Sequence, residues 1–201
     1  MVLILILFNC PISISGPYGK EMVLDIEKYL KDVNVEGKDV LVIGTQIPWI
    51  ELLAIVNNAN SVTTVEYQKI HCQYPKLVTM TTREFNEKFL KNELPNYDLV
   101  ISQSSIEHSG LGRYGDALNP WGDVIAMAKA WCVSKPDGKA LIGFPVGPKD
   151  KIVFNSHRVY GKIMLPHVLA NWKLESTNLD LSKYSEVCNW CYEPLFLLSK
   201  T

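Results

Sequence analysis

The sequence of 201 residues lacks any apolar run long enough to span a membrane. Its one extended apolar run, Val2 to Phe8, falls far short of the roughly 18 to 20 residues that cross a bilayer. Charge of one sign is not in excess either, since 20 basic and 21 acidic side chains leave a formal net charge of −1. Nucleic-acid binders depend on a basic surface, so we expect neither a membrane span nor a nucleic-acid partner.

The sequence also lacks paired cysteines and clustered histidines. Its five cysteines are an odd number, and only Cys188 and Cys191 have the spacing of metal ligands, without a second pair to complete a site. We therefore expect no metal centre and no disulfide framework, and we interpret the cysteines as buried thiols. No Asn-x-Ser/Thr acceptor is present, which agrees with a cytoplasmic protein.

Hydrophobic residues make up 47% of the sequence, which is enough for one sizeable core. We expect a single domain over 21–201, preceded by an N-terminal extension or strand over 1–20. Short β-branched runs predict strands, and apolar residues at helical spacing predict helices. Strands are expected at 38–43, 61–66, 77–80, 97–102, 139–144, 172–180 and 193–199; helices are expected at 22–30, 49–56, from Thr81, from Asn119 to Trp131, and from His157 with a break at Pro166; a turn is expected at 135–138.

Strand and helix alternate five times along the chain. Because crossovers between parallel strands are right-handed, this alternation favours an α/β fold. The predicted architecture is a doubly wound, mostly parallel sheet with helices on both faces, which is Rossmann-like. Ligands of such sheets bind beyond the carboxyl ends of the strands, and we expect a small-molecule ligand there.

Glu66 is the first candidate at that edge of the sheet. It ends a predicted strand 22 residues after Gly44, close to the roughly 20 residues expected for an acidic residue that binds a ribose diol. A carboxylate has the two acceptor oxygens that a diol requires. The alternative is that Glu66 only caps a strand at the surface.

The chain also contains a Gly-x-Gly-x-x-Gly pattern at Gly110, Gly112 and Gly115, which we reject as a dinucleotide fingerprint. The pattern begins eight residues after the predicted strand ends at Ser102, and it does not open a helix. We expect instead a long functional loop over 103–119 that becomes ordered around a ligand.

Three segments carry a resemblance to a known family. Glu66, the phrase Tyr97 to Ser102 followed by Glu107-His108, and the turn Lys135-Pro136-Asp137-Gly138 resemble those of class I S-adenosylmethionine-dependent methyltransferases. More closely, the segments 109–116, 119–123 and 157–161 are similar to a Caenorhabditis domain family of unknown function. The resemblance implies a methyltransferase-type fold with S-adenosylmethionine as its cofactor.

The same resemblance implies cofactor-binding residues after the first and fourth predicted strands. They would be Gly44, Thr45, Gln46, Glu66 and Ser102. The chain departs from the family at Gly44-Thr45-Gln46, where methyltransferases of this class usually have Gly-x-Gly. Bulky Ile47 and Trp49 follow.

Glu107 and His108 are the candidate catalytic residues, because the resemblance places them next to the methyl group. A histidine has a pKa suited to accepting a proton from a hydroxyl or amine nucleophile near neutral pH. The alternative is that His108 orders the loop through a hydrogen bond to the backbone.

Four further residues are candidates for binding the substrate. Arg113 could pair with a carboxylate or phosphate, or it could brace the loop against Asp116 or Asp123. His157, Arg158 and Tyr160 could close the site, or they could begin a helix.

Two functions therefore remain open from the sequence. The first is an S-adenosylmethionine-dependent methyltransferase for an unidentified small-molecule or other acceptor. The second is a non-catalytic methyltransferase-like binding or scaffold module, which the departure at Gln46 favours. A nicotinamide-dependent oxidoreductase is a distant third, since phosphate-binding glycines do not follow the first predicted strand.

Overall fold

The computed structural model describes residues 17–183 and 192–201. The chain divides into two compact units, residues 1–101 and 102–201, and each is described by itself. The apolar run Val2 to Phe8, which lies in the expected N-terminal extension or strand, and the Cys188/Cys191 pair are outside the described residues. The single domain over 21–201 stays a prediction.

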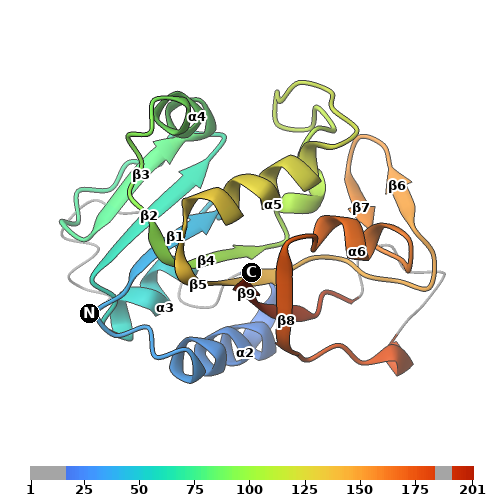
Figure 1. The fold of residues 1–201 in the computed structure, drawn as a ribbon, viewed down its shortest axis with the longest axis horizontal. Helices are drawn as coiled ribbons and strands as arrows, with labels where there is room; N and C mark the ends of the chain where they lie inside the picture. The colour runs from blue at the N-terminus through green and yellow to red at the C-terminus, as the bar shows by residue number, and fades with distance from the viewer. Residues whose placement is uncertain (1–16, 184–191) are drawn as a thin grey trace. The chain divides into compact units, whose positions relative to one another are not determined.

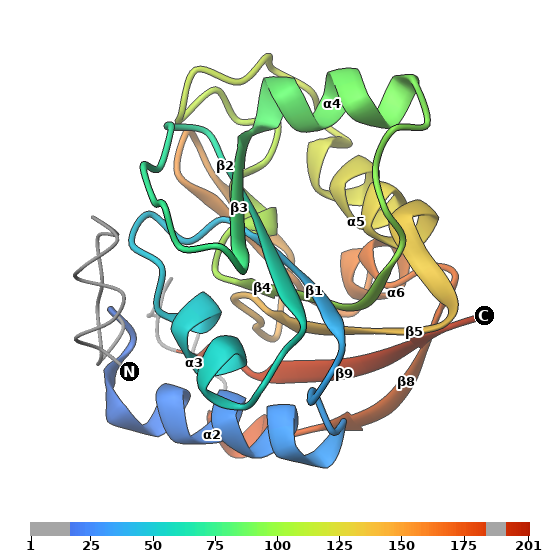
Figure 2. The same ribbon diagram turned by 90° about the vertical axis from the view of Figure 1, so that its left-hand side faces the viewer.

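The first unit is an α/β arrangement built on parallel strands. Strand β1 pairs in parallel with both β2 and β4, and β2 pairs in parallel with β3. Figures 1 and 2 show α2 and α3 on one face of these strands and α4 on the other. The elements are α2 (Gly19–Asp32), β1 (Asp39–Ile43), α3 (Ile50–Val56), β2 (Ser61–Glu66), β3 (Leu77–Thr81), α4 (Thr82–Leu90) and β4 (Tyr97–Gln103), which continues into the second unit.

Local sequence explains where these elements lie. The central residues of β1, Val40, Leu41 and Val42, are fully buried, as expected for a strand covered by helices on both faces. Helix α4 begins with a capping box, in which the Thr81 side chain accepts from the Glu84 amide and Glu84 accepts from the Thr81 amide. The helix start predicted from this pair is confirmed.

The second unit combines antiparallel strands with helices. Strand β9 pairs antiparallel with both β5 and β8, and α5 and α6 contact each other. A separate hairpin joins β6 to β7. The elements are η1 (Ile106–His108), α5 (Gly122–Val133), β5 (Ser134–Gly143), β6 (Lys151–Val153), β7 (His157–Val159), α6 (Met164–Val168), β8 (Trp172–Thr177), η2 (Leu181–Lys183) and β9 (Leu195–Lys200).

The main sheet has seven strands in the order β3-β2-β1-β4-β5-β9-β8. The predicted doubly wound, mostly parallel sheet is therefore confirmed. The order reverses between β1 and β4, so the carboxyl ends of β1, β2 and β4 are the expected ligand-binding edge.

Three local predictions were wrong. His157 begins a strand instead of a helix, because Lys151 to Val153 provide a partner strand that the sequence pattern did not reveal, and the expected break at Pro166 is absent, since α6 runs through it. Helix α5 begins at Gly122, since Asn119 uses its side-chain oxygen to accept from the Trp121 amide in a turn before the helix. Residues 135–138 continue strand β5 instead of forming a separate turn.

The predicted buried thiols are also corrected. Cys132 is exposed, and Cys72 takes part in a disulfide. Within the described residues, no helix is long and apolar enough to cross a membrane. Nor do three His, Cys, Asp or Glu side chains of that part of the chain come together as a metal site would require.

Candidate functional site

The first candidate site lies where β1 and β2 end. The two strands are neighbours in register, with Ile43 opposite Val65, so the residues that follow them meet at one edge. Glu66 Oε2 accepts from the backbone amides of Thr45 at 2.9 Å and Gln46 at 3.2 Å. Of the predicted cofactor-binding residues, the structure thus brings Thr45, Gln46 and Glu66 together, and Gly44 precedes them in the same loop.

The conformation of this loop bears on whether a cofactor fits. Gly44 has a φ of +72°, and Gln46 has a φ of +51°, which is uncommon for a residue with a side chain. The Glu66 carboxylate also accepts from the Tyr67 amide at 2.6 Å. Three backbone amides therefore fill most of the roughly four acceptor positions of this carboxylate.

A ribose diol fits Glu66 only if the loop gives way. The 3.2 Å bond from Gln46 is the longest of the three, so it is the one that a ligand hydroxyl would replace at least cost. Rotation of Gln46 would release that oxygen and leave the Thr45 amide bound. The residues present fit the cofactor with this one adjustment.

Glu51 lies beneath the same loop and was missed from the sequence. It is completely buried in the first turn of α3, where Thr64 Oγ1 donates to its Oε1 at 2.7 Å. Thr45 Oγ1 lies 3.1 Å from Glu51 Oε2 and also donates to the Ile47 carbonyl at 3.0 Å. Since a hydroxyl has one proton, a protonated Glu51 satisfies both contacts. Burial raises the Glu51 pKa to about 7.

A charged residue at position 51 carries little signal in the sequence. Glu51 stands between Ile50 and Leu52, so it reads as one polar position in an apolar helix. The available signal was its place in the first turn after the loop, where an acidic side chain favours the helix N-terminus.

The second candidate site belongs to the second unit and contains Glu107 and His108. Both side chains are buried in the short helix η1. His108 Nδ1 lies 2.5 Å from the Ser156 carbonyl oxygen, which makes Nδ1 the protonated nitrogen. Burial lowers the His108 pKa, so its ring is neutral near pH 7. His108 Nε2 lies 3.5 Å from Glu107 Oε1.

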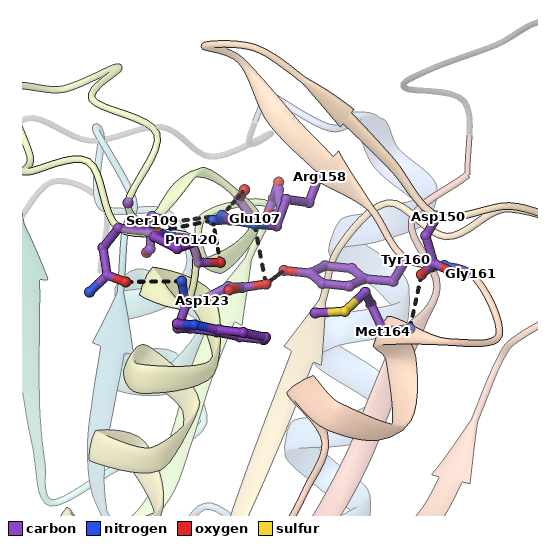
Figure 3. A network of polar contacts seen from close by, with 12 residues as sticks. Glu107, Ser109, Pro120, Asp123, Asp150, Arg158, Tyr160, Gly161 and Met164 are labelled. Carbon is purple, nitrogen blue, oxygen red and sulfur yellow. Dashed lines mark hydrogen bonds and ion pairs between the residues drawn. The ribbon is translucent and has the colours of Figure 1, made fainter.

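Arg158 occupies the centre of a buried network in the same unit (Figure 3). It is only 4% exposed. Its Nη1 donates to the carbonyls of Glu107 and Ser109, and its Nη2 donates to those of Asn119 and Pro120. Its Nε pairs with Asp123 at 3.5 Å. Every N–H group of the guanidinium thus has a partner in the protein, which leaves none for a substrate.

The other predicted substrate-binding residues have different surroundings. Tyr160 is fully buried and donates from its hydroxyl to Asp123 Oδ2 at 2.9 Å (Figure 3). His157 is also fully buried, and its Nδ1 lies 3.0 Å from Ser156 Oγ. Arg113 is exposed and donates to the same Ser156 Oγ at 3.0 Å. Arg113 is therefore the one of these residues whose charge reaches solvent, and their roles in substrate binding stay predictions.

The loop over 103–119 is packed, contrary to the expectation that a ligand would order it. Asp116 Oδ2 accepts from the Gly110 and Gly112 amides, and Arg158 donates to the Ser109 and Asn119 carbonyls of the loop. A Cβ at Gly110 would lie 2.1 Å from the Asn119 carbonyl oxygen. The glycine at position 110 therefore allows two backbone segments to pack closely. From the sequence, the same glycine had been interpreted as a sign that the loop opens easily.

Ser102 and three further residues complete the end of β4. Ser102, predicted to bind the cofactor, is fully buried in that strand. Next to it, Gln103, Ser104 and Glu193 form hydrogen bonds that include Glu107. Glu193 was missed because it lies 86 residues beyond Glu107 in the sequence and no motif surrounds it.

Comparison with solved structures identifies the class of fold. A Burkholderia thailandensis 1,6-didemethyltoxoflavin-N1-methyltransferase, solved with 1,6-didemethyltoxoflavin and S-adenosylhomocysteine bound, is similar with a TM-score of 0.63 at 11% identity, over 89% of this chain and 78% of that one. A Listeria monocytogenes protein described as a candidate S-adenosylmethionine-dependent methyltransferase has a TM-score of 0.57 at 10% identity, over 90% and 98%. The fold is thus methyltransferase-like.

Other solved relatives are longer than this chain. The protein SMU.776, solved with S-adenosylhomocysteine, has a TM-score of 0.59 at 13% identity, over 87% of this chain and 48% of its own. No curated protein matches the sequence. A family profile described as "Caenorhabditis protein of unknown function, DUF268" matches residues 37–186. The chain belongs to this family, as the similarity of its loop segments indicated.

Proposed function

We propose that this chain binds S-adenosylmethionine at the carboxyl ends of β1 and β2 and transfers its methyl group to a small-molecule acceptor. The observation that carries the proposal is the position of Glu66, beside the amides of Thr45 and Gln46 at the edge where doubly wound sheets bind ligands. Glu66 would accept from the ribose hydroxyls, and the loop amides would bind the carboxylate. When bound, the cofactor supplies a methyl group activated by its sulfonium.

The likeness to solved methyltransferases supports this proposal through the fold alone. The Burkholderia enzyme was solved with S-adenosylhomocysteine, the demethylated cofactor. In this chain, the departure at Gln46 requires a rotation that a glycine would not need. The side chain of Glu66 is only half-buried, so a ligand has access to it.

A second function is favoured by the same hydrogen bonds. Because three backbone amides already satisfy Glu66, the carboxylate could serve only to hold the loop after β1. The chain would then be a methyltransferase-like binding or scaffold module without catalysis.

Substitution of Glu66 separates the two functions. We expect wild-type protein to bind S-adenosylhomocysteine in calorimetry, and Glu66→Ala to weaken binding by about 1–3 kcal/mol, or about 5- to 150-fold, through loss of a charge-assisted contact. Glu87→Ala, which removes an exposed carboxylate of α4, is the matched control and should bind as the wild type does. Gln46→Gly should bind at least as tightly, since glycine adopts a φ of +51° without strain.

The absence of heat and of a thermal shift at millimolar cofactor would remove the methyltransferase proposal. A drop in melting temperature for Glu66→Ala without any wild-type binding would favour the scaffold.

We further propose that His108 is the general base, acting through Nε2. The test is His108→Asn, because the amide nitrogen of asparagine can replace Nδ1 as the donor to the Ser156 carbonyl while no base remains at the Nε2 position. We expect turnover to fall about 10²- to 10⁴-fold with little change in cofactor affinity or melting temperature. Steady-state kinetics on an acceptor found by screening would measure this effect. Full turnover in His108→Asn would assign His108 to loop ordering.

A further inference from the structure

Two carboxyl groups of the second unit share one hydroxyl. Ser104 Oγ lies 2.8 Å from Glu107 Oε1 and 3.3 Å from Glu193 Oε1. Gln103 Nε2 donates to the other oxygen of Glu193 at 2.8 Å. We call these four residues the Glu107–Glu193 cluster. They lie at the carboxyl end of β4 and just before β9.

The number of protons in the cluster follows from its geometry. A serine hydroxyl can donate to only one acceptor at a time. If both carboxyls were ionised, one of them would face a lone pair of Ser104 Oγ without a hydrogen bond. The contacts are therefore satisfied when one carboxyl is protonated and donates to Ser104, which in turn donates to the other.

The proton belongs on Glu107. This side chain is completely buried, and its Oε2 has no hydrogen-bond partner among the described residues. Burying an oxygen without a hydrogen bond costs less free energy when the carboxyl is neutral than when it is ionised. Burial, together with the charge of Glu193, raises the Glu107 pKa to about 8. Glu193 is half-buried and reaches solvent. Burial raises its pKa as well, but only to about 7, so Glu193 loses its proton before Glu107 does and is the member that carries the negative charge.

The charged groups around the cluster do not neutralise Glu193. His108 lies 3.5 Å from Glu107 and is neutral, and Arg158 uses its N–H groups on other partners. No Lys or Arg of the described residues forms an ion pair with either carboxyl of the cluster. Gln103 Oε1, on a side chain only 2% exposed, is a further acceptor without a donor.

The backbone holds the cluster in place at some cost. Ser104 has a φ of +49°, a strained value for a serine, and its amide donates to the Gly143 carbonyl. A Cβ at Gly143 would lie 1.8 Å from Gln103 Oε1, so a larger residue there would displace the Gln103 side chain from this position. The acceptors are thus fixed before any ligand arrives, which lowers the entropic cost of binding.

We propose that the Glu107–Glu193 cluster binds a protonated amine. The ammonium group donates hydrogen bonds to Glu193 and Ser104, the members that solvent reaches, while Glu107 behind them keeps the proton. A cluster of acceptors with one negative charge fits an ammonium and rejects an anion. That this amine is the methyl acceptor rests on the proposed function; its binding does not.

The experiment compares benzylamine with benzyl alcohol, which has the same ring without the ammonium. Full-length protein with ¹³C-labelled glutamate carboxyls is titrated by NMR, without cofactor, and the signals are assigned with Glu107→Gln and Glu193→Gln. We expect benzylamine alone to shift the Glu193 signal and to lower the pH at which it titrates. Glu193→Gln should weaken benzylamine binding at least about 10-fold, as loss of a charge-assisted contact predicts.

Two further variants complete the test. Glu175→Gln removes another carboxylate of this unit and should leave benzylamine binding unchanged. Ser104→Ala should uncouple the titrations of Glu107 and Glu193, and it carries the test if Glu193→Gln does not fold. The proposal would be overturned if the amine and the alcohol bound equally, or if Glu193→Gln still bound benzylamine as the wild type does. Buried water would then be the partner of Glu107 Oε2 and Gln103 Oε1.

Failure of this proposal is distinguishable from failure of the proposed function. Benzylamine binding to a protein that does not bind S-adenosylhomocysteine would keep the amine site and remove the methyltransferase. The reverse result would remove the amine site alone.

Discussion

Arg158→Ala is expected to lower the free energy of unfolding by about 3–5 kcal/mol, the usual effect of removing one partner of a buried ion pair. The substitution leaves Asp123, which is completely buried, without its cation. It also strands the loop carbonyls that Arg158 binds, including those of Ser109 and Asn119. The free energy of unfolding of natural proteins is about 5–15 kcal/mol, so this loss would be a large share of the total.

Urea denaturation followed by far-UV circular dichroism would measure the effect, with Arg113→Ala as the matched control. Arg113 is exposed and donates a hydrogen bond to Ser156 Oγ, so its removal should change stability by less than about 1 kcal/mol. Arg158→Lys should restore little, because an ammonium cannot reach four carbonyls and a carboxylate at once. If Arg158→Ala were as stable as the control, the contacts described for Arg158 would not stabilise the fold. Arg158 would then again be a candidate for substrate binding.

Glu51→Gln is expected to stabilise the protein at pH 8 and to leave its stability unchanged near pH 4. Burial raises the pKa of Glu51 from about 4.5 to about 7. Between these two values the folded chain retains a proton that the unfolded chain has lost, so the stability due to Glu51 falls as the pH rises. Above pH 7 the loss is complete, and it is on the order of 3 kcal/mol for a shift of this size.

Glutamine keeps the hydrogen bonds of the neutral carboxyl, since its amide nitrogen can donate to Thr45 while its oxygen accepts from Thr64. Urea denaturation at several pH values would compare it with the wild type and with Glu87→Gln, an exposed control. Burial also raises the pKa of Glu107, so the stability of every variant still depends on pH through that residue. The difference between Glu51→Gln and the wild type isolates the contribution of Glu51. A Gln variant with the same pH dependence as the wild type would show that Glu51 is ionised in the fold.

Much of the fold was predictable because local chemistry and tertiary packing agree there. The runs Lys38 to Ile43 and Tyr97 to Ser102 are apolar and β-branched, which is what a strand buried on both faces requires. The pair Thr81 and Glu84 placed a helix start correctly. The family was predictable for a similar reason, since its loop segments carry unusual combinations of residues in close succession.

The predictions that were wrong depend on partners distant in the sequence. His157 to Val159 form a strand only because β6 is available to pair with them. Cys72 was taken for a thiol because nothing in a sequence pairs one cysteine with another. The glycines from Gly110 to Gly115 indicated a mobile loop, since a sequence does not show which carbonyl lies against them.

The sequence by itself therefore determined the alternation of strands and helices as far as β4, the edge of the sheet at which a ligand is expected, and Glu66 as the acidic residue at that edge. Periodicity and spacing along one chain are sufficient for these features. Tertiary structure alone decided that Arg158 is used up inside the protein, that Glu51 lies beneath the Thr45 loop, and that Glu193 joins Glu107 across Ser104. Burial and long-range hydrogen bonds set the charge of each of these groups, and both depend on which residues the fold brings together.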